Sequence, residues 1–555
     1  MPVAPATSIQ AVADSVAPHV STWWRLLAFV SAFLASVVAA PLIARLALKL
    51  KVVDAPDGNR KLHRRPIPLT GGPTILVSLA VGVGLTLWMF PDLLLHTKGD
   101  FHFLIGLFVS GGIIVAVGLI DDRYGIRGRQ KLAAQFVAAL VMLPAGMLIE
   151  KVSIFGFEPD FGDLALLIGG GLTVLFIVGA INALNLIDGM DGMASTTGIV
   201  LSFSVAAVSV ISAGRPDGLL ISLVLAGALC GFLIFNFPPA RMFLGDSGSM
   251  LIGLVLGAVA LKCSMKSYTT IALVMPAAIW AIPLFDAFMA VVRRKLTGRS
   301  IYETDRGHLH HCLERKGLGG GKLLATTAAL CALTGLGAIA ASTLGTDQWL
   351  GRAGSATDLI AVVGVLTAIS LLVITRSFGH TEMSLLTSRL LRLTGSMLQR
   401  RNRNTTVLHD EEVRLHGDLN WQTLWETLVA FAERFEMDSL EFCVNLPRIG
   451  EEYHASWKRR NSTEAHEEWK SEIPLIVEGM RVGYIRVAGA VGAGSICRWM
   501  SDLIGGLQSF EDELVQLIQE LQVQHAGDRR SKPVLEPAQT VRSDSEQLIL
   551  PQETT

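Results

Sequence analysis

Long apolar runs occupy most of the chain before residue 380, and short polar segments separate them. A helix of about 20 apolar residues spans the roughly 30 Å hydrocarbon core of a bilayer, and we count about eleven such runs. The pattern therefore predicts a polytopic α-helical membrane protein with about eleven transmembrane helices. The predicted spans lie near residues 22–44, 72–91, 101–120, 131–150, 163–182, 196–213, 218–235, 247–262, 270–291, 323–344 and 357–376.

The pattern changes after residue 376. The leucines and arginines of MSLLTSRLLRLTGSMLQRRNRN are spaced as in a basic amphipathic helix, which would lie on an anionic membrane surface. Beyond it, WQTLWETLVAFAERF has a helical apolar stripe, LEFCVNL alternates like a strand, and IPLIVEGMRVGYIRV is typical of a hairpin turning at Gly479. With a further helical stretch from about 496 to 522, these elements predict a small α+β domain. The expected divisions are an N-terminal segment 1–21, a transmembrane domain 22–376, a juxtamembrane segment 377–410, the α+β domain 411–524 and a polar, disordered tail 525–555.

The composition agrees with this division. Of the 555 residues, 51% are hydrophobic and 17% are charged, and the mean hydropathy of +0.47 is too high for an ordinary soluble protein. The net charge of -1 offers no basic excess to neutralise a phosphate backbone, which argues against a nucleic-acid-binding protein. The six cysteines form no CxxC pair, so neither a zinc site nor a disulfide framework is indicated.

Positive charge is concentrated in alternate loops. The loops after the first, third and ninth predicted spans are rich in arginine and lysine, and the loops between them carry little net positive charge. Because basic loops face the cytoplasm, we expect the N-terminus outside and the residues after 376 inside. The basic loop residues are Arg60, Lys61, Arg64 and Arg65, then Arg123, Arg127, Arg129 and Lys131, then Arg293, Arg294, Lys295, Arg299, Arg306, Arg315 and Lys316.

Four polar motifs all fall on the expected cytoplasmic face. They are DDRYGIRGRQK from residue 121, NALNLIDGMDGMAS from residue 182, NFPPARMFLGDSGS from residue 236 and GRSIYETDRGHLHHCL from residue 298. Ordinary loop residues would have no reason to avoid the outer loops so completely. The pattern predicts one composite site at the inner membrane surface.

Five carboxylates belong to these motifs, and beside a low-dielectric membrane they would repel one another unless cations compensate. Mg²⁺ prefers one or two protein carboxylates and completes its octahedron with water and phosphate oxygens, which leaves the other carboxylates for substrate positioning or proton transfer. The nearby histidines and arginines suit the binding of a diphosphate. Together these groups predict phosphoryl transfer, in which positioning and charge neutralisation provide most of the catalysis. The five carboxylates are those of Asp121, Asp122, Asp188, Asp191 and Asp246.

Simpler interpretations stay open at this point. A DG pair is usually a turn, Asp246 or Ser247 is expected to cap the eighth span, and HLHH would also suit a solvated loop or a transition-metal site. An EF-hand is excluded because Asp188 and Asp191 are three residues apart and no ligand loop of that type follows. A transporter would place its carboxylates near the middle of the bilayer, often in two repeated halves, and we find no repeat in the sequence. A sensor or scaffold without activity is a further alternative.

The four motifs resemble those of the polyprenyl-phosphate N-acetylhexosamine-1-phosphate transferases. This family includes the bacterial UDP-N-acetylglucosamine:undecaprenyl-phosphate N-acetylglucosamine-1-phosphate transferases of glycosyltransferase family 4, and phospho-N-acetylmuramoyl-pentapeptide transferase is a more distant relative. The resemblance covers residues from about 22 to 376. It is carried by DD at 121, NxxNxxDGxDGxA at 182, NxPPARxFxGDSGS at 236, GRSxxxxDRxHLHH at 298 and the basic segment RKLHRRPIPLTGG at 60–72.

The resemblance implies a reaction and a place for it. N-Acetylglucosamine-1-phosphate, or a close N-acetylhexosamine-1-phosphate, would pass from the UDP-sugar to undecaprenyl phosphate, which gives the lipid-diphosphate-sugar and UMP with Mg²⁺ or Mn²⁺ as cofactor. This is the first membrane step toward a cell-envelope polysaccharide such as lipopolysaccharide O-antigen or teichoic acid. The protein would be a multi-pass protein of the bacterial inner (cytoplasmic) membrane, in contact with membrane lipid, with its active site and C-terminal domain in the cytoplasm.

The resemblance also implies roles for individual residues. Asp246 would bind the metal, with Asn182 and Asp188 as secondary candidates, and Asp121 and Asp122 would handle the lipid phosphate. Asp188 and Asp191 would complete the catalytic carboxylates. The substrate-binding residues would be Asn236 and Phe243 at the uridine, Asn185 beside them, and Arg64, Arg299, His308, His310 and His311 at the diphosphate or sugar.

Two positions depart from the family pattern. Gly125 stands where many relatives have a third acidic residue, and Ile301 stands where proline is common. A phosphate monoester is largely a dianion at neutral pH because its second pKa is near 6, so we favour direct attack by the lipid phosphate over a two-step route through an aspartate. The sequence leaves open which UDP-sugar and polymer are involved, whether the chain forms a homodimer, and whether the C-terminal domain binds a ligand or protein.

Overall fold

The computed structural model divides the chain into two compact units, a membrane unit of residues 1–388 and a C-terminal unit of residues 389–555. The structure describes residues 23–54, 66–93, 101–149, 151–155, 157, 161–211, 216–264, 270–296, 307–345, 354–380, 383, 409–416, 421–434, 437–446, 451–459, 468–477 and 480–490.

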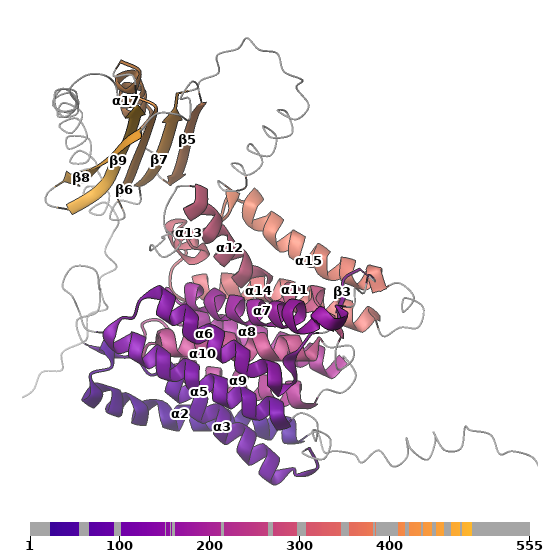
Figure 1. Cartoon of the computed structure of the whole chain (residues 1–555). Helices are drawn as coiled ribbons and strands as arrows, with labels where there is room; N and C mark the ends of the chain where they lie inside the picture. Colours follow the sequence, from indigo (N-terminus) through magenta and orange to yellow (C-terminus); the bar gives the residue numbers. More distant parts are fainter. Residues whose placement is uncertain are drawn as a thin grey trace, which may run out of the picture. The chain divides into compact units, whose positions relative to one another are not determined.

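The membrane unit is built from helices that run mostly side by side (Figure 1). Nine of the described helices are long and apolar enough to cross a membrane, which makes the chain a polytopic helical membrane protein. The long helices are α2 (Trp23–Leu50), α3 (Gly71–Met89), α5 (Phe101–Tyr124), α6 (Gly128–Met142) with its π-helical extension Leu143–Met147, the 3₁₀ turn Gly162–Leu164 with α7 (Ala165–Ile187), α8 (Met193–Ile211), α9 (Pro216–Asn236), α10 (Gly245–Cys263) and α14 (Gly321–Gly345). The shorter elements are β1 (Val53–Asp54), β2 (Ile67–Pro68), β3 (Lys151–Ser153), β4 (Thr270–Ala272), α11 (Val274–Ile279), α12 (Ala281–Leu296), α13 (Leu309–Arg315) and α15 (Gly354–Ile374).

The expected count of eleven spans differs from the nine found among the described residues, and the difference lies in two places. The segment 270–291 is not one span, because it divides into β4, α11 and α12 with a break at Trp280. Pro276 and Pro283 each lie within the first turn of their helix, where a missing backbone N–H is tolerated, whereas a proline in a helix interior kinks or breaks the helix. α15 runs over 21 residues at the place of the predicted span 357–376, and it is left out of the nine only because its described side chains begin at Asp358.

α10 lies at the centre of the membrane unit, and 94% of the residues in its most apolar 18-residue stretch are buried. It packs against α3, α5, α7 and α8. Glycines allow the close approach: a Cβ added at Gly253 would lie 2.6 Å from Cα of Ile181 in α7, and one added at Gly118 of α5 would lie 2.3 Å from Cα of Ser247. Small residues at helix interfaces let the backbones meet in this way. The N-terminus of α10 is therefore held directly against α5.

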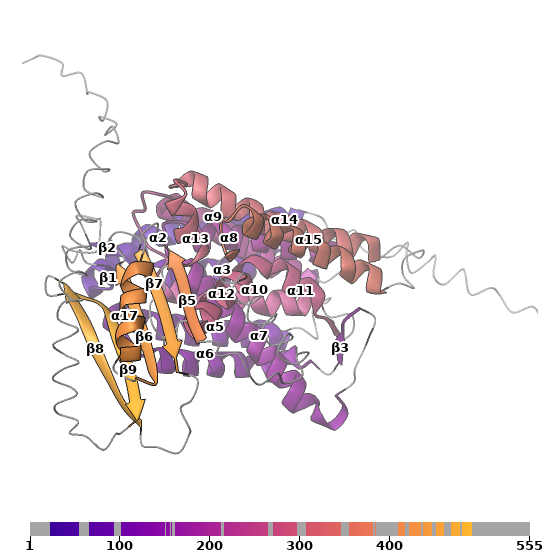
Figure 2. The same ribbon diagram turned by 90° about the horizontal axis from the view of Figure 1, so that it is seen from above.

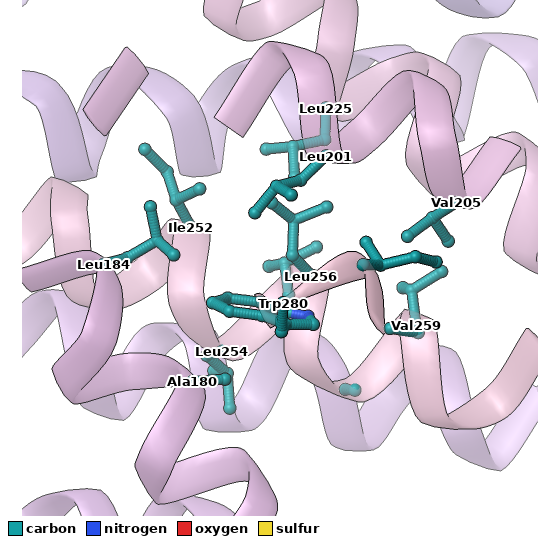
Figure 3. Packing of buried hydrophobic residues seen from close by; sticks show 14 of the residues in the cluster. Ala180, Leu184, Leu201, Val205, Leu225, Ile252, Leu254, Leu256, Val259 and Trp280 are labelled. Carbon is teal, nitrogen blue, oxygen red and sulfur yellow. The ribbon is translucent and has the colours of Figure 1, made fainter. Parts of the chain in front are cut away.

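A cluster of buried apolar side chains lies beside α10 (Figure 3). Trp280, at the break between α11 and α12, is fully buried there and points among Leu254 and Leu256 of α10. Leu201 of α8 and Leu225 of α9 close the same cluster. Burial of large side chains stabilises such packing by about 1.5–3 kcal/mol each in water, and in a membrane the same contacts act through dispersion and shape.

The C-terminal unit contains a five-stranded antiparallel sheet in the order β5-β7-β6-β9-β8. Helix α17 lies on one face of the sheet (Figure 2) and contributes Trp425 and Leu428 to a core that includes Phe442 and Trp457. LEFCVNL lies in β6, and β8 and β9 pair antiparallel on either side of Gly479, as the strand and hairpin patterns predicted. The predicted helix 496–522, most of the basic segment 377–410, the tail 525–555 and residues 1–21 lie outside the described residues. The elements are β5 (His409–His416), α17 (Gln422–Arg434), β6 (Ser439–Leu446), β7 (Glu451–Lys458), β8 (Glu468–Val477) and β9 (Met480–Ala490).

Candidate active site

Three helices meet at a lysine that lies between two carboxylates. Lys131, one turn into α6, places its Nζ 2.6 Å from Asp246 Oδ2 at the start of α10 and 3.0 Å from Asp121 Oδ2 near the end of α5. The side chain of Lys131 is 16% exposed and that of Asp121 is 10% exposed, so the attraction acts with limited screening by water. Asp246 is the most accessible of the three at 36%, which leaves one side of this carboxylate open to a ligand.

Asp122 fixes the N-terminus of α10 from the neighbouring helix. Its Oδ1 accepts the backbone N–H of Asp246 at 2.8 Å, and its Oδ2 accepts the hydroxyl of Ser247 at 2.9 Å and the backbone N–H of Ser247 at 3.3 Å. The first helical N–H groups have no partner within their own helix, and a carboxylate is the best acceptor for them. The expected cap by Asp246 or Ser247 is therefore wrong: the N-cap residue Leu244 makes no side-chain cap, and Asp122 of α5 supplies it.

Gly245 lets the chain pass this close to Asp122. Its φ of +70° lies in the left-handed region that favours glycine, and a Cβ there would lie 2.8 Å from Asp122 Oδ2. The glycine of the GDSGS motif is thus required by the geometry that seats Asp246.

Asn185 on α7 holds the other oxygen of Asp246. Its Nδ2 donates to Asp246 Oδ1 at 2.5 Å and to Ser249 Oγ at 2.9 Å. Asn182 lies one turn deeper, and its Nδ2 donates to Gln135 Oε1 at 2.6 Å and to the Val178 carbonyl at 2.8 Å. The two asparagines therefore have different roles. Asn185 orients the carboxylate of Asp246, and Asn182 joins α7 to α6.

The loop after α7 carries the remaining carboxylates. Asp191 Oδ2 accepts the backbone N–H of Ala240 at 2.9 Å, which ties this loop to the NFPPAR segment. Burial raises the pKa of Asp188 well above its usual value, and the nearby negative charges of Asp246, Asp122 and Asp191 raise it further. Asp188 is thus close enough to the other carboxylates to respond to a positive ligand that binds among them.

Asn236 and Phe243 bracket the NFPPARMF segment. Asn236 is buried and makes two hydrogen bonds within the protein, from Ser195 Oγ to its Oδ1 and from its Nδ2 to the Met242 carbonyl, both 2.9 Å. Phe243 is half-buried, and its backbone pairs with Pro68 and Thr70 in front of α3. Asn236 shapes the segment, and Phe243 is the residue of the two with a partly open side chain.

The three histidines of HLHH lie in different environments. His308 is buried, and its Nδ1 lies 3.2 Å from Asp286 Oδ2 of α12. His310 is buried against the aspartate loop, since a Cβ added at Gly189 would lie 2.2 Å from His310 Nε2. Burial lowers the pKa of His310 to about 3, with a contribution from His311. His311 is one-third exposed and lies 3.7 Å from Glu314. The structure thus brings the histidine motif and the DGMDG motif into contact, as a composite site requires.

Two of the predicted site residues lie outside the described part of the chain, and two residues of the site were not predicted from the sequence. Arg64 and Arg299 lie outside the described residues. Lys131 counted only as loop charge in the sequence, although it stands at the start of a predicted span, where a charge is unusual. Asp286 was missed altogether. A carboxylate in the middle of the run 270–291 was the available signal, because an ionisable residue in such a run is a functional hypothesis by default.

The donor set suits a metal ion held partly by substrate. Among the described residues no group of three or more His, Cys, Asp or Glu could hold a metal ion. Mg²⁺ does not need such a cage, because one or two carboxylates plus phosphate oxygens suffice. Lys131 compensates part of the negative charge of Asp121 and Asp246, and Asp246, at 36% exposure, is the more accessible of the two carboxylates. Asp246 could therefore hold a Mg²⁺ ion whose remaining ligands come from outside the protein.

Comparison with known proteins assigns this site to a family. The sequence profile described as Glycosyl transferase family 4 matches residues 104–264, which run from α5 to α10. The chain is 33% identical over 295 residues to a probable undecaprenyl-phosphate N-acetylglucosaminyl 1-phosphate transferase of Bacillus subtilis, covering 53% of this chain and 78% of the relative. This chain belongs to glycosyl transferase family 4.

Other members of the family match the same part of the chain. A decaprenyl-phosphate N-acetylglucosaminephosphotransferase of Mycolicibacterium smegmatis is 36% identical over 291 residues, covering 48% of this chain and 70% of the relative. A phospho-N-acetylmuramoyl-pentapeptide-transferase of Shouchella clausii is 32% identical over 312 residues, covering 52% of this chain and 89% of the relative. About half of this chain thus corresponds to most of a family enzyme.

Proposed function

We propose that this family 4 enzyme transfers N-acetylglucosamine-1-phosphate, or a close N-acetylhexosamine-1-phosphate, from a UDP-sugar to undecaprenyl phosphate. The observation that carries the proposal is the junction of Asp121, Lys131 and Asp246, which lies within the segment matched by the family profile. The names of the relatives support the polyprenyl phosphate acceptor and the amino sugar. The product would be the lipid-diphosphate-sugar, and UMP would leave.

The reaction needs an oxygen of the lipid phosphate to attack the β-phosphorus of the UDP-sugar. The attacking group is a phosphate, largely dianionic at neutral pH, so it requires orientation and charge compensation more than deprotonation. Lys131 lies where it can compensate charge, and Asp121 holds it there. Both oxygens of Asp122 hold the start of α10, so this residue sets the position of Asp246. This arrangement favours direct attack over a route through an aspartyl intermediate.

We propose Mg²⁺, or Mn²⁺ in its place, as the cofactor, with Asp246 as its protein ligand. Bound there, the ion would supply positive charge to the diphosphate and to the departing UMP. Asn185 would keep one oxygen of Asp246 oriented, and Asn182 would act one turn away through its contact with Gln135. His308, His310 and His311 would form the side of the site that binds the diphosphate or the sugar.

We further propose that the site and the C-terminal unit lie in the cytoplasm and that the N-terminus lies outside. The alternation of basic loops supports this orientation. The proposed cellular place is the bacterial inner membrane, at the first membrane step toward a polysaccharide such as O-antigen or a teichoic acid.

The decisive experiment is an incubation of the purified protein with labelled UDP-N-acetylhexosamines, undecaprenyl phosphate and Mg²⁺. We expect one UDP-sugar to give a lipid-diphosphate-sugar, identified by mass, with one equivalent of UMP. Release of the free sugar-1-phosphate without a lipid product would show hydrolysis and contradict the proposal.

A further inference from the structure

Helix α12 presents an apolar stripe that two charged residues interrupt. Ile282, Asp286, Ala290 and Arg293 recur at helical spacing and are all buried, with Asp286 fully so. A buried carboxylate is unfavourable unless it is paired or hydrogen-bonded. The buried carboxylate of Asp286 is therefore expected to have hydrogen-bonding partners.

Both oxygens of Asp286 bind the histidine loop. Oδ1 accepts the backbone N–H of Leu309 at 2.9 Å, and Oδ2 lies 3.2 Å from His308 Nδ1. Arg293, two turns further along α12, meets the same loop at its start, since a Cβ added at Gly307 would lie 2.2 Å from the guanidinium carbon of Arg293. α12 therefore contacts residues 307, 308 and 309 in succession.

The two bonds of Asp286 fix the ring of His308 as well as its backbone. A carboxylate accepts but does not donate, so the facing Nδ1 carries the proton and Nε2 is left to interact on the other side of the ring. The same arrangement in other enzymes sets the tautomer and orientation of a histidine through a buried carboxylate.

The orientation of His308 is passed on toward the carboxylates. The rings of His308 and His310 are parallel, with an interplanar angle of 2° and centroids 5.9 Å apart. His310 in turn packs against Gly189 of the aspartate loop. A rotation of His308 would thus disturb the contact between the two motifs.

We propose that Asp286 is the positioning residue of the histidine motif, which sets the tautomer and direction of His308 toward the donor diphosphate. Asp286 itself does not contact substrate. The inference rests on the proposed function, because it gives His308 the role of donor binding. It adds a residue outside the four sequence motifs to the determinants of UDP-sugar binding.

The test is steady-state kinetics of Asp286→Asn with separate KM values for the UDP-sugar and for undecaprenyl phosphate. An asparagine still accepts from Leu309 through its carbonyl, but its NH₂ group then faces His308 Nδ1 and requires the opposite tautomer. We expect the KM for the UDP-sugar to rise by about 10- to 100-fold, with the KM for undecaprenyl phosphate changed by less than about twofold. Asp358→Asn is the matched control, because Asp358 of α15 likewise accepts a backbone N–H, that of Phe155, and its replacement should leave both values unchanged.

A double-mutant cycle separates positioning from general stability. In a His308→Ala background, Asp286→Asn should lower kcat/KM by less than about threefold, because the ring that it positions is gone. Multiplicative losses, or equal rises in both KM values, would overturn the proposal. If Asp286→Asn yields no folded protein, Asp286→Glu takes its place under the same criteria, since it keeps the charge and moves the carboxylate.

The outcomes distinguish this inference from the proposed function. A wild-type protein that transfers normally beside an Asp286→Asn variant with unchanged kinetics sinks the inference alone. A wild-type protein without transfer from any UDP-N-acetylhexosamine sinks the proposed function, and the inference with it.

Discussion

Lys131 places a single positive charge between two carboxylates, and its removal changes how these carboxylates interact. In Lys131→Met, Asp121 and Asp246 keep their backbone supports but repel each other across the vacated position. We expect kcat to fall by about 10²–10³-fold, the usual effect of removing one positive or hydrogen-bonding group from a charged transition state. Initial rates at saturating substrates measure this. Lys322→Met, at an exposed lysine at the start of α14, is the control and should retain full activity.

Asp246 is the proposed metal ligand, and its replacement should be visible in the dependence on metal concentration. Asp246→Asn keeps the size of the side chain but removes the charge, so we expect the variant to fold and to lose most activity when Mg²⁺ is limiting. A titration of rate against Mg²⁺ measures the effect. Near-normal turnover at limiting Mg²⁺ would rule out this ligand assignment.

His310 links stability to pH in a direction set by its burial. Its folded pKa of about 3 lies below the unfolded value of 6.5, so the neutral ring stabilises the fold fully above pH 6.5 and progressively less as pH falls toward 3. Each pH unit in that window removes up to about 1.4 kcal/mol. We expect the unfolding temperature in detergent to drop between pH 7.5 and 5.5, and to drop less in His310→Asn. Identical drops would mean that folding does not lower the pKa of His310.

The residues of the site could be predicted from the sequence where their spacing carried the information. Asn185 and Asp246 were both expected at the site, and in the structure Asn185 Nδ2 donates to Asp246 Oδ1 at 2.5 Å. The partner of a residue in another helix could not be read in the same way. Lys131 and Asp286 act through contacts that packing creates, at 115 and 22 residues' separation from Asp246 and His308, and no local pattern encodes such contacts.

At the scale of elements, the contact between the aspartate loop and α13 depends on a residue without a side chain. A Cβ at Gly189 would lie 2.2 Å from His310 Nε2, so in Gly189→Ala either the His310 ring or one of the two loops must move. A misplacement of about 1 Å can lower activity by about 10²-fold, and we expect kcat/KM for the UDP-sugar to fall by that order. The control is Gly171→Ala within α7, where a Cβ would meet nothing within 4 Å. Equal activity of the two variants would show that the loops do not need this contact.

The helices themselves could be predicted from apolar length alone, and the exception shows the limit of that rule. The run 270–291 has the length of a span, yet Pro276 and Pro283 divide it, and Asp286 and Arg293 turn its second half toward the histidine loop. Hydropathy averages over these residues. The break in the run, and the contact of its second half with the histidine loop, depend on single residues within the run.

At the scale of the whole molecule, the described site residues lie in the membrane unit, and we predict that the C-terminal unit modulates or recruits without catalysing. Charged side chains of its sheet pair with one another, since Arg486 lies 2.7 Å from Glu441 and 2.9 Å from Glu472. A chain truncated near residue 405 should insert and convert UDP-sugar within about tenfold of the full-length rate, a barrier change of about 1.4 kcal/mol. A correctly inserted truncation without turnover would require the C-terminal unit to be part of the active site.

Because Asp122 of α5 caps α10, activity depends on the correct assembly of the helices. Asp246 receives its position from side chains on other helices, Asp122 on α5, Lys131 on α6 and Asn185 on α7. A chain in which one of these helices has failed to insert carries no partial site, because the carboxylate would lack its backbone anchor or its partners. We therefore expect incompletely inserted molecules to be inactive, so that they do not use undecaprenyl phosphate at all. The specific activity of a preparation then measures the fraction of molecules whose bundle is complete.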